Sequence, residues 1–147
     1  MHSAISYNAE NISYSLKNKK IITSWLKKII NHEGKKTCII SFIFCDDTFL
    51  YELNKKYLKH KTLTDIITFD YSEADNISGD IYISIDRVRE NAEEFRKTFH
   101  NELCRVMCHG ILHLTGYLDT TQSERLGMRA KEDEYLLLLE KMDKRST

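Results

Sequence analysis

The stretch Thr37-Cys-Ile-Ile-Ser-Phe-Ile-Phe-Cys45 is the strongest strand signal in this 147-residue chain. β-branched and aromatic residues dominate it and its length suits one strand, so it predicts a buried central strand. Two more strands are expected in Thr64–Tyr71 and Asp80–Ile85, and the short link Asp75–Gly79 predicts that they pair as a hairpin. A fourth strand is expected at Ile5–Tyr7.

Five helical patterns accompany these strands, each marked by apolar spacing or by an end signal. They are Leu16–Ile30, a helix from the caps Asp46 and Asp47 to Tyr57, Arg87–Phe95 after the cap Asp86, Asn101–Leu114 before Gly116, and Thr121–Lys141 with its Thr-Gln-Ser-Glu capping box. About four strands and about five helices predict an α+β domain with a small mixed sheet packed against helices.

The composition predicts one globular domain spanning residues 1–147. The chain has no proline, and its five glycines fit neither GxGxxG nor GxxxxGK spacing, so no nucleotide cofactor is expected. Lys and Arg number 22, as do Asp and Glu, so a nucleic acid would have to meet a local basic patch. No apolar run approaches the roughly 18 residues of a membrane span, which predicts a cytoplasmic protein without a membrane partner.

The segment from His109 to Asp119 carries the clearest chemical signal. Residues four apart on a helix share one face, so His109 and His113 can direct two imidazoles at one metal ion. Gly116 permits a left-handed turn that ends this central helix and brings Asp119 back as a third ligand. Three such ligands suit one zinc ion with an open position. In the alternative interpretation, local hydrogen bonds satisfy both histidines and Asp119 merely begins a loop.

The residue after the first histidine bears on the kind of enzyme. Zinc peptidases with an HExxH motif carry a glutamate there, which acts as the general base. This chain has Gly110 at that position, so the motif disfavours a protease although the ligand spacing is similar.

With these residues in view, the chain resembles the bacterial YbeY family, whose signature is HGxLHLxGYDH. The segment His109–Tyr117 matches nine signature positions, wildcards included. The resemblance extends to Asn54-x-x-Tyr57, Thr64-Asp-Ile-Ile-Thr-Phe69, Gly79-Asp-Ile81 and Met128-x3-Glu132. It implies a zinc-dependent endoribonuclease that is specific for single strands and acts in 16S ribosomal RNA 3′-end maturation and ribosome quality control. The implied partners are ribosomal RNA and the small ribosomal subunit.

Two departures from the family pattern matter, one at the end of the signature and one after the Asn-x-x-aromatic segment. The signature ends in Asp-His, whereas this chain has Leu118 and Asp119, so Asp119 stands where the family usually has its third zinc-binding histidine. A carboxylate can replace an imidazole on zinc. The family usually has an arginine, thought to act in catalysis, after its Asn-x-x-aromatic segment, and Leu58 occupies that position here. The catalytic residues therefore stay unassigned.

A run of lysines is the best candidate for contacts with an RNA backbone. Lysines release counterions when they meet phosphates, which is the main source of sequence-independent affinity. In the alternative interpretation the run is a solvated helix end, where the helix dipole favours cations. The candidate RNA-binding residues are Lys55, Lys56, Lys59 and Lys61, with His60 among them.

The sequence thus predicts phosphodiester cleavage in single-stranded RNA at a zinc site formed by His109, His113 and Asp119. Two other functions remain open. One is a non-catalytic ribosome-assembly binding module with a structural metal, which the missing arginine favours. The other is a small-substrate metallohydrolase that uses the same ion.

Overall fold

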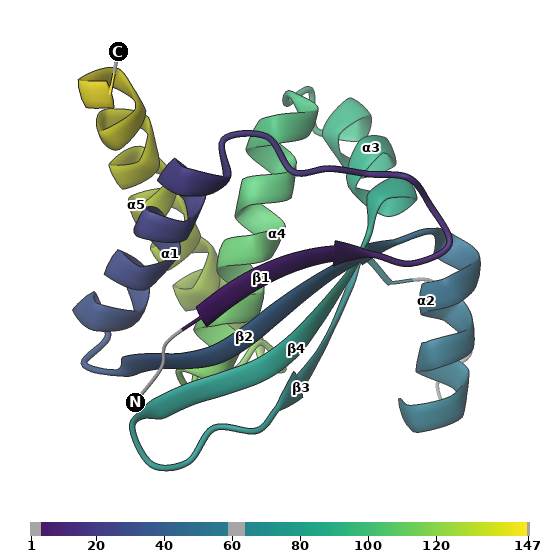
Figure 1. Ribbon diagram of the computed structural model, residues 1–147, viewed down its shortest axis with the longest axis horizontal. Helices are drawn as coiled ribbons and strands as arrows, with labels where there is room; N and C mark the ends of the chain where they lie inside the picture. Colours follow the sequence, from purple (N-terminus) through teal and green to yellow (C-terminus); the bar gives the residue numbers. More distant parts are fainter. Residues whose placement is uncertain (1–3, 59–63, 147) are drawn as a thin grey trace.

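Four strands form one mixed sheet in the computed structural model of the chain, which describes residues 4–58 and 64–146 (Figure 1). β2 pairs in parallel with β1 and with β4, and β3 runs antiparallel to β4, so the order is β1-β2-β4-β3. The predicted α+β fold with a small mixed sheet is confirmed. The strands are β1 (Ala4–Ala9), β2 (Lys36–Cys45), β3 (Ile66–Asp70) and β4 (Asn76–Ser84).

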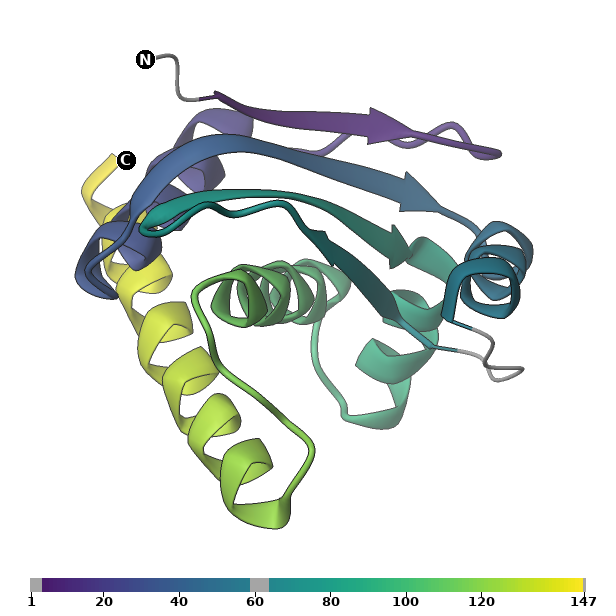
Figure 2. The ribbon, with the colours of Figure 1, turned by 90° about the horizontal axis from the view of Figure 1, so that it is seen from below.

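Five α-helices lie within these described ranges, and Figure 2 shows α4 beneath the sheet with α5 and α3 on either side of it. α2 lies beyond the strand ends and continues into one π-helical turn, Asn54–Leu58. None of the helices described is long and apolar enough to cross a membrane. The helices are α1 (Lys19–His32), α2 (Asp47–Leu53), α3 (Ile85–Glu94), α4 (Phe99–Leu114) and α5 (Gln122–Ser146).

Several element boundaries differ from the sequence prediction, and two of the differences change a predicted turn or helix cap. β4 begins at Asn76, so much of the expected link between the hairpin strands is itself strand, and the turn lies earlier. α3 begins at Ile85 because the Ser84 hydroxyl accepts a hydrogen bond from the Arg87 amide at 3.2 Å. Ser84 is therefore the N-cap, and the prediction of Asp86 was wrong.

The apolar face of α4 packs directly on the sheet, and this contact positions the site described next. Gly110 lies at the contact, where an added Cβ would be 2.9 Å from Ile81 Cγ2 and 3.0 Å from Ile66 Cδ1. A larger residue would push the helix away from β3 and β4. On the other side of the core, the buried Trp25 indole donates a hydrogen bond to the Tyr135 carbonyl at 2.7 Å, which joins α1 to α5.

Candidate metal centre

α4 ends just after His113, and the following turn directs the chain back toward the helix. The amide of Tyr117 donates to the Leu112 carbonyl at 3.0 Å, which closes the turn. Gly116 has φ +116°, a conformation that residues with a Cβ rarely adopt, so the predicted role of this glycine is confirmed. The Tyr117 hydroxyl donates to Glu33 Oε1 at 2.8 Å and anchors the turn to the end of α1.

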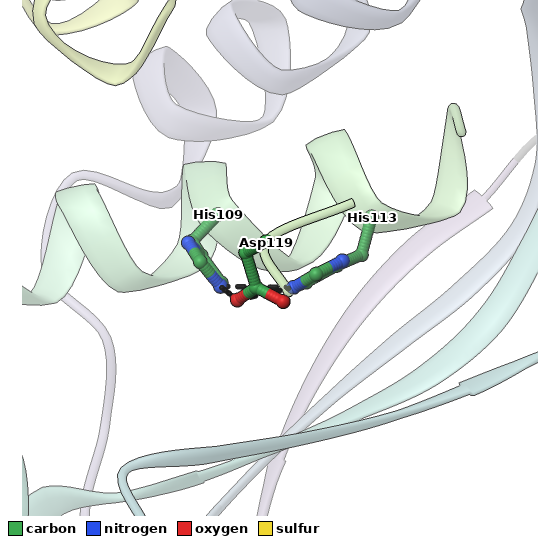
Figure 3. Close-up of side chains that lie close together, drawn as sticks. All are labelled: His109, His113 and Asp119. Carbon is green, nitrogen blue, oxygen red and sulfur yellow. Dashed lines mark hydrogen bonds and ion pairs between the residues drawn. The ribbon is translucent and has the colours of Figure 1, made fainter. Parts of the chain in front are cut away.

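Three candidate ligand atoms converge at this helix end (Figure 3). The Nε2 atoms of His109 and His113 are 2.9 Å apart, and each lies 3.2 Å from Asp119 Oδ2. Zinc bonds of about 2.0–2.2 Å in a tetrahedral arrangement place neighbouring ligand atoms about 3.3 Å apart. The observed triangle is close to this size, so the structure brings together the three residues expected from the sequence.

The opposite nitrogen of each imidazole already has a partner. His113 Nδ1 donates to the Tyr117 carbonyl at 3.0 Å, and His109 Nδ1 donates to Glu132 Oε2 at 2.6 Å. A ring that donates through Nδ1 presents an unprotonated Nε2 when neutral, which is the form that binds metals. Two such lone pairs and a carboxylate oxygen repel one another at this distance unless a cation lies among them. The donor set therefore fits a zinc ion.

Glu132 on α5 is a part of the centre that the motif spacing did not identify. Its side chain is 6% exposed, and Arg105 Nη1 on α4 donates to its other oxygen at 2.9 Å. Arg105 also pairs with Asp133, so its charge balances two carboxylates. Carboxylates that accept from a ligand histidine hold the ring in orientation and raise its basicity. The match at Met128-x3-Glu132 was the available signal, but it did not indicate this role.

The electrostatic surroundings of His109 favour a positive charge. Burial alone lowers the pKa of this imidazole, but the hydrogen bond and charge of Glu132 raise it, with further contributions from Asp119 and Asp65. The balance leaves the pKa of His109 above its ordinary value. A site that stabilises an extra proton on a ring nitrogen also stabilises a metal cation in the same place.

A cavity of about 500 Å³ opens beside the centre, and both His109 and Asp119 contribute to its wall. Asp65 and Glu102 lie on the same wall, and burial raises the pKa of each carboxyl, which favours its protonated form. Neither residue stood out in the motif analysis, although Asp65 lies inside the family-like segment Thr64–Phe69. The cavity is also lined by three arginines, Arg105, Arg125 and Arg129.

The described lysines of the predicted RNA-binding patch lie elsewhere. Lys55 pairs with Glu52 at 3.3 Å and Lys56 Nζ lies 5.2 Å from the centre of the Tyr57 ring, both on the π-helical turn. Neither contributes to the wall of the cavity beside the metal centre, as far as the described residues show. Lys59 and Lys61, with His60, lie outside the described residues. The structure therefore does not join Lys55 and Lys56 to the candidate metal centre.

Comparison with known proteins agrees with this geometry. A family profile described as "Endoribonuclease YbeY" matches residues 4–140. A protein of that name from Flavobacterium psychrophilum is 51% identical over 134 residues, which cover 91% of this chain and 95% of the relative. Another from Amoebophilus asiaticus is 50% identical over 134 residues, covering 90% and 91%. This α+β chain with a histidine-rich helix end belongs to the YbeY family.

The fold is also found in a solved structure. The solution structure of TM1509 from Thermotoga maritima superposes with a TM-score of 0.64 at 30% identity, covering 92% of this chain and 89% of that one. The likeness therefore extends over most of the fold.

Proposed function

We propose that this chain is a metal-dependent endoribonuclease that cleaves single-stranded RNA with one zinc ion held by His109, His113 and Asp119. The observation that carries the proposal is the convergence of two Nε2 atoms and one carboxylate oxygen, at 2.9 and 3.2 Å, on the wall of a cavity. Relatives that cover most of the chain and carry the name endoribonuclease support the activity.

Each residue of the centre has a distinct part in this proposal. A bound zinc ion supplies Lewis acidity toward a phosphoryl oxygen and lowers the pKa of a coordinated water toward about 7. Glu132 and the Tyr117 carbonyl hold the two imidazoles so that Nε2 faces the ion. Asp65 and Glu102, whose carboxyl pKa values are raised by burial, are the cavity groups suited to hold a proton during bond cleavage.

The cellular role proposed here is 16S ribosomal RNA 3′-end maturation and ribosome quality control, in the cytoplasm and on the small ribosomal subunit. Membership in the YbeY family supports this role. We also propose that residues 1–147 act as one domain, which is supported by a family match that extends over residues 4–140.

A non-catalytic ribosome-assembly module is the second candidate. One observation favours it: Leu58 occupies the position where the resemblance leads one to expect an arginine, and this side chain is 43% exposed on the π-helical turn. In such a module the metal would only hold the turn after α4. A small-substrate metallohydrolase is the third candidate, and the cavity of about 500 Å³ would suit its substrate.

Metal content and RNA cleavage separate these functions. We expect about one zinc per purified chain, and cleavage of a single-stranded RNA that is lost with chelator and restored by zinc. His113→Ala should lose both metal and cleavage. His100→Ala, which removes an exposed histidine from the same helix, should lose neither.

The other outcomes point elsewhere. Full zinc occupancy in His113→Ala would move the site away from α4. Stoichiometric zinc without cleavage of any RNA would favour the binding module, and equal cleavage of single-stranded and duplex RNA would contradict the proposed specificity.

A further inference from the structure

The helix that holds Glu132 also presents arginines to the cavity beside the metal centre. Arg125, Arg129 and Glu132 are spaced by four and three residues on α5, so they share one face of the helix. Glu132 accepts the hydrogen bond from His109 Nδ1, and Arg129 lies about one turn away from it. The face of α5 whose Glu132 orients His109 therefore also carries the positive charges of Arg125 and Arg129.

The three arginines that line the cavity differ in how many hydrogen bonds and ion pairs their guanidinium groups already make. Arg105 is committed to Glu132 and Asp133, and its side chain is 13% exposed. Arg125 donates to the Thr120 carbonyl at 2.7 Å. Arg129 is exposed and makes no hydrogen bond or ion pair with any residue in the described ranges. Its charge acts at longer range, where it lowers the pKa of Glu102. Arg129 thus keeps its guanidinium donors available to a ligand in the cavity.

The chemistry of a ligand for Arg129 follows from the cavity wall. A guanidinium offers parallel donors that match two oxygens of a phosphate, which an ammonium cannot do. Of the four carboxyls on the wall, Glu132 is paired with Arg105 and Asp119 belongs to the candidate metal centre. Burial raises the pKa of the other two, Asp65 and Glu102, which weakens their repulsion of an anion. Arg125 and Arg129 have no carboxylate partner among the described residues, so they are the cations that an anion can meet there, and an RNA phosphodiester is the anion that the proposed activity brings.

We propose that Arg129 is a phosphate-binding residue of this cavity, whose guanidinium binds a backbone phosphate of the RNA beside the candidate metal centre. The inference rests on the proposed function, because that function places single-stranded RNA at His109, His113 and Asp119. Arg125 would be a second cation for the phosphate, although one of its donors is already used by the Thr120 carbonyl.

The test compares zinc-loaded wild type with Arg129→Ala, Arg129→Lys and the control Lys141→Ala. Lys141 is exposed on the same helix, about 18 Å farther along it, and its removal costs the same single charge. The first readout is the affinity for an uncleavable single-stranded deoxyoligonucleotide as a function of salt. The second is kcat and KM for the matching RNA.

We expect Arg129→Ala to weaken oligonucleotide binding roughly tenfold at low salt and to reduce the slope of log affinity against log salt by about 0.7. Arg129→Lys should recover the slope but not the full kcat, because lysine keeps the positive charge but lacks the two parallel N–H donors of a guanidinium. Lys141→Ala should behave as wild type. Zinc content should be equal in all four proteins, which excludes an indirect effect through the metal centre.

The outcomes distinguish this inference from the proposed function. If wild type cleaves RNA and Arg129→Ala matches Lys141→Ala in slope, affinity and kcat, the inference is wrong and the function stands. If wild type binds the oligonucleotide through Arg129 but cleaves no RNA, the phosphate contact stands and the function is wrong. A wild type that neither binds nor cleaves overturns both.

Discussion

His109 on α4 and Glu132 on α5 are joined by a hydrogen bond of 2.6 Å between Nδ1 and Oε2, although they are 23 residues apart in the chain. The bond crosses the contact between the two helices at the point where the candidate metal centre begins. The orientation of the first candidate ligand therefore depends on a residue outside the group of three candidate ligands.

Glu132→Gln should reduce zinc affinity by about 10–100-fold, the usual effect of losing an outer partner of a ligand histidine. The amide keeps the size of the side chain but removes the charge that raises the basicity of His109. A competition titration against a zinc chelator measures the affinity. Glu134→Gln, an exposed change two residues along α5, is the matched control. Equal affinities in the two variants would mean that Glu132 serves only the ion pair with Arg105.

The third ligand can be tested by its charge. Asp119→Ala should weaken zinc binding more than Glu132→Gln does. The first change removes a candidate metal ligand, whereas the second removes only the hydrogen-bond partner of one. Asp119→His should retain the metal and make the centre one charge more positive. The pH at which cleavage reaches half its plateau should then move down, since a more positive site favours deprotonation of water.

These two variants must behave differently for Asp119 to be a ligand. Zinc affinity and the pH-rate profile are measured for both and for wild type. If Asp119→Ala binds zinc as tightly as wild type, Asp119 is only a residue of the turn.

The lysine patch predicts a purely electrostatic effect on RNA binding. Replacing its four lysines with alanine should reduce the salt slope by about 0.7 for each RNA phosphate that a lysine no longer neutralises, and folding should stay intact. The matched control replaces four exposed lysines on α1 or just before it: Lys17, Lys19, Lys20 and Lys28. An unchanged slope in the patch variant would assign its lysines to a solvated helix end. The patch residues are Lys55, Lys56, Lys59 and Lys61.

Glu102 should make folding depend on pH. Burial raises the pKa of this carboxyl in the folded protein, and Arg105 only partly offsets the effect. When folding raises the pKa of a carboxyl, the group contributes most to the free energy of unfolding at pH values below its unfolded pKa. That contribution is lost as the pH rises through the folded pKa. Glu102→Gln should therefore unfold at higher urea than wild type at pH 7, and the gain should shrink toward pH 4. Urea titrations of chelator-treated protein at both pH values measure this; a constant difference would contradict it.

Local signals predicted the elements that carry most of the site. The His109–Asp119 segment contains its own helix spacing and its own turn glycine, so two candidate ligands and the return of a third follow from nearby residues. The β-branched run at Thr37–Cys45 likewise contains what a central strand needs, and it is β2 in the structure.

The parts that sequence reasoning missed depend on contacts between distant segments. Glu132 acquires its role only because α5 packs beside α4, and Asp65 faces the cavity only because of where β3 begins. Ser84 and Asp86 are both residue types that cap helices well, but Ser84 accepts from the Arg87 amide, whereas Asp86 accepts from the amide of the distant Asp47. Spacing along the chain contains no information about such pairings.

Gly110 limits how the enzymatic chemistry of this helix can diversify. A peptidase of the HExxH kind would need a glutamate at this position, but here the position faces Ile81 and Ile66 at 2.9 and 3.0 Å from any Cβ. A glutamate would lift α4 off the sheet and carry His109 with it, so the ligand and the base could not coexist. New acid–base groups are therefore expected elsewhere on the cavity wall, where Glu102 on α4 and Asp65 just before β3 already lie. Variation among relatives in reaction rate or substrate should concentrate there, while the helix that carries the two candidate histidine ligands stays constrained by the core beneath it.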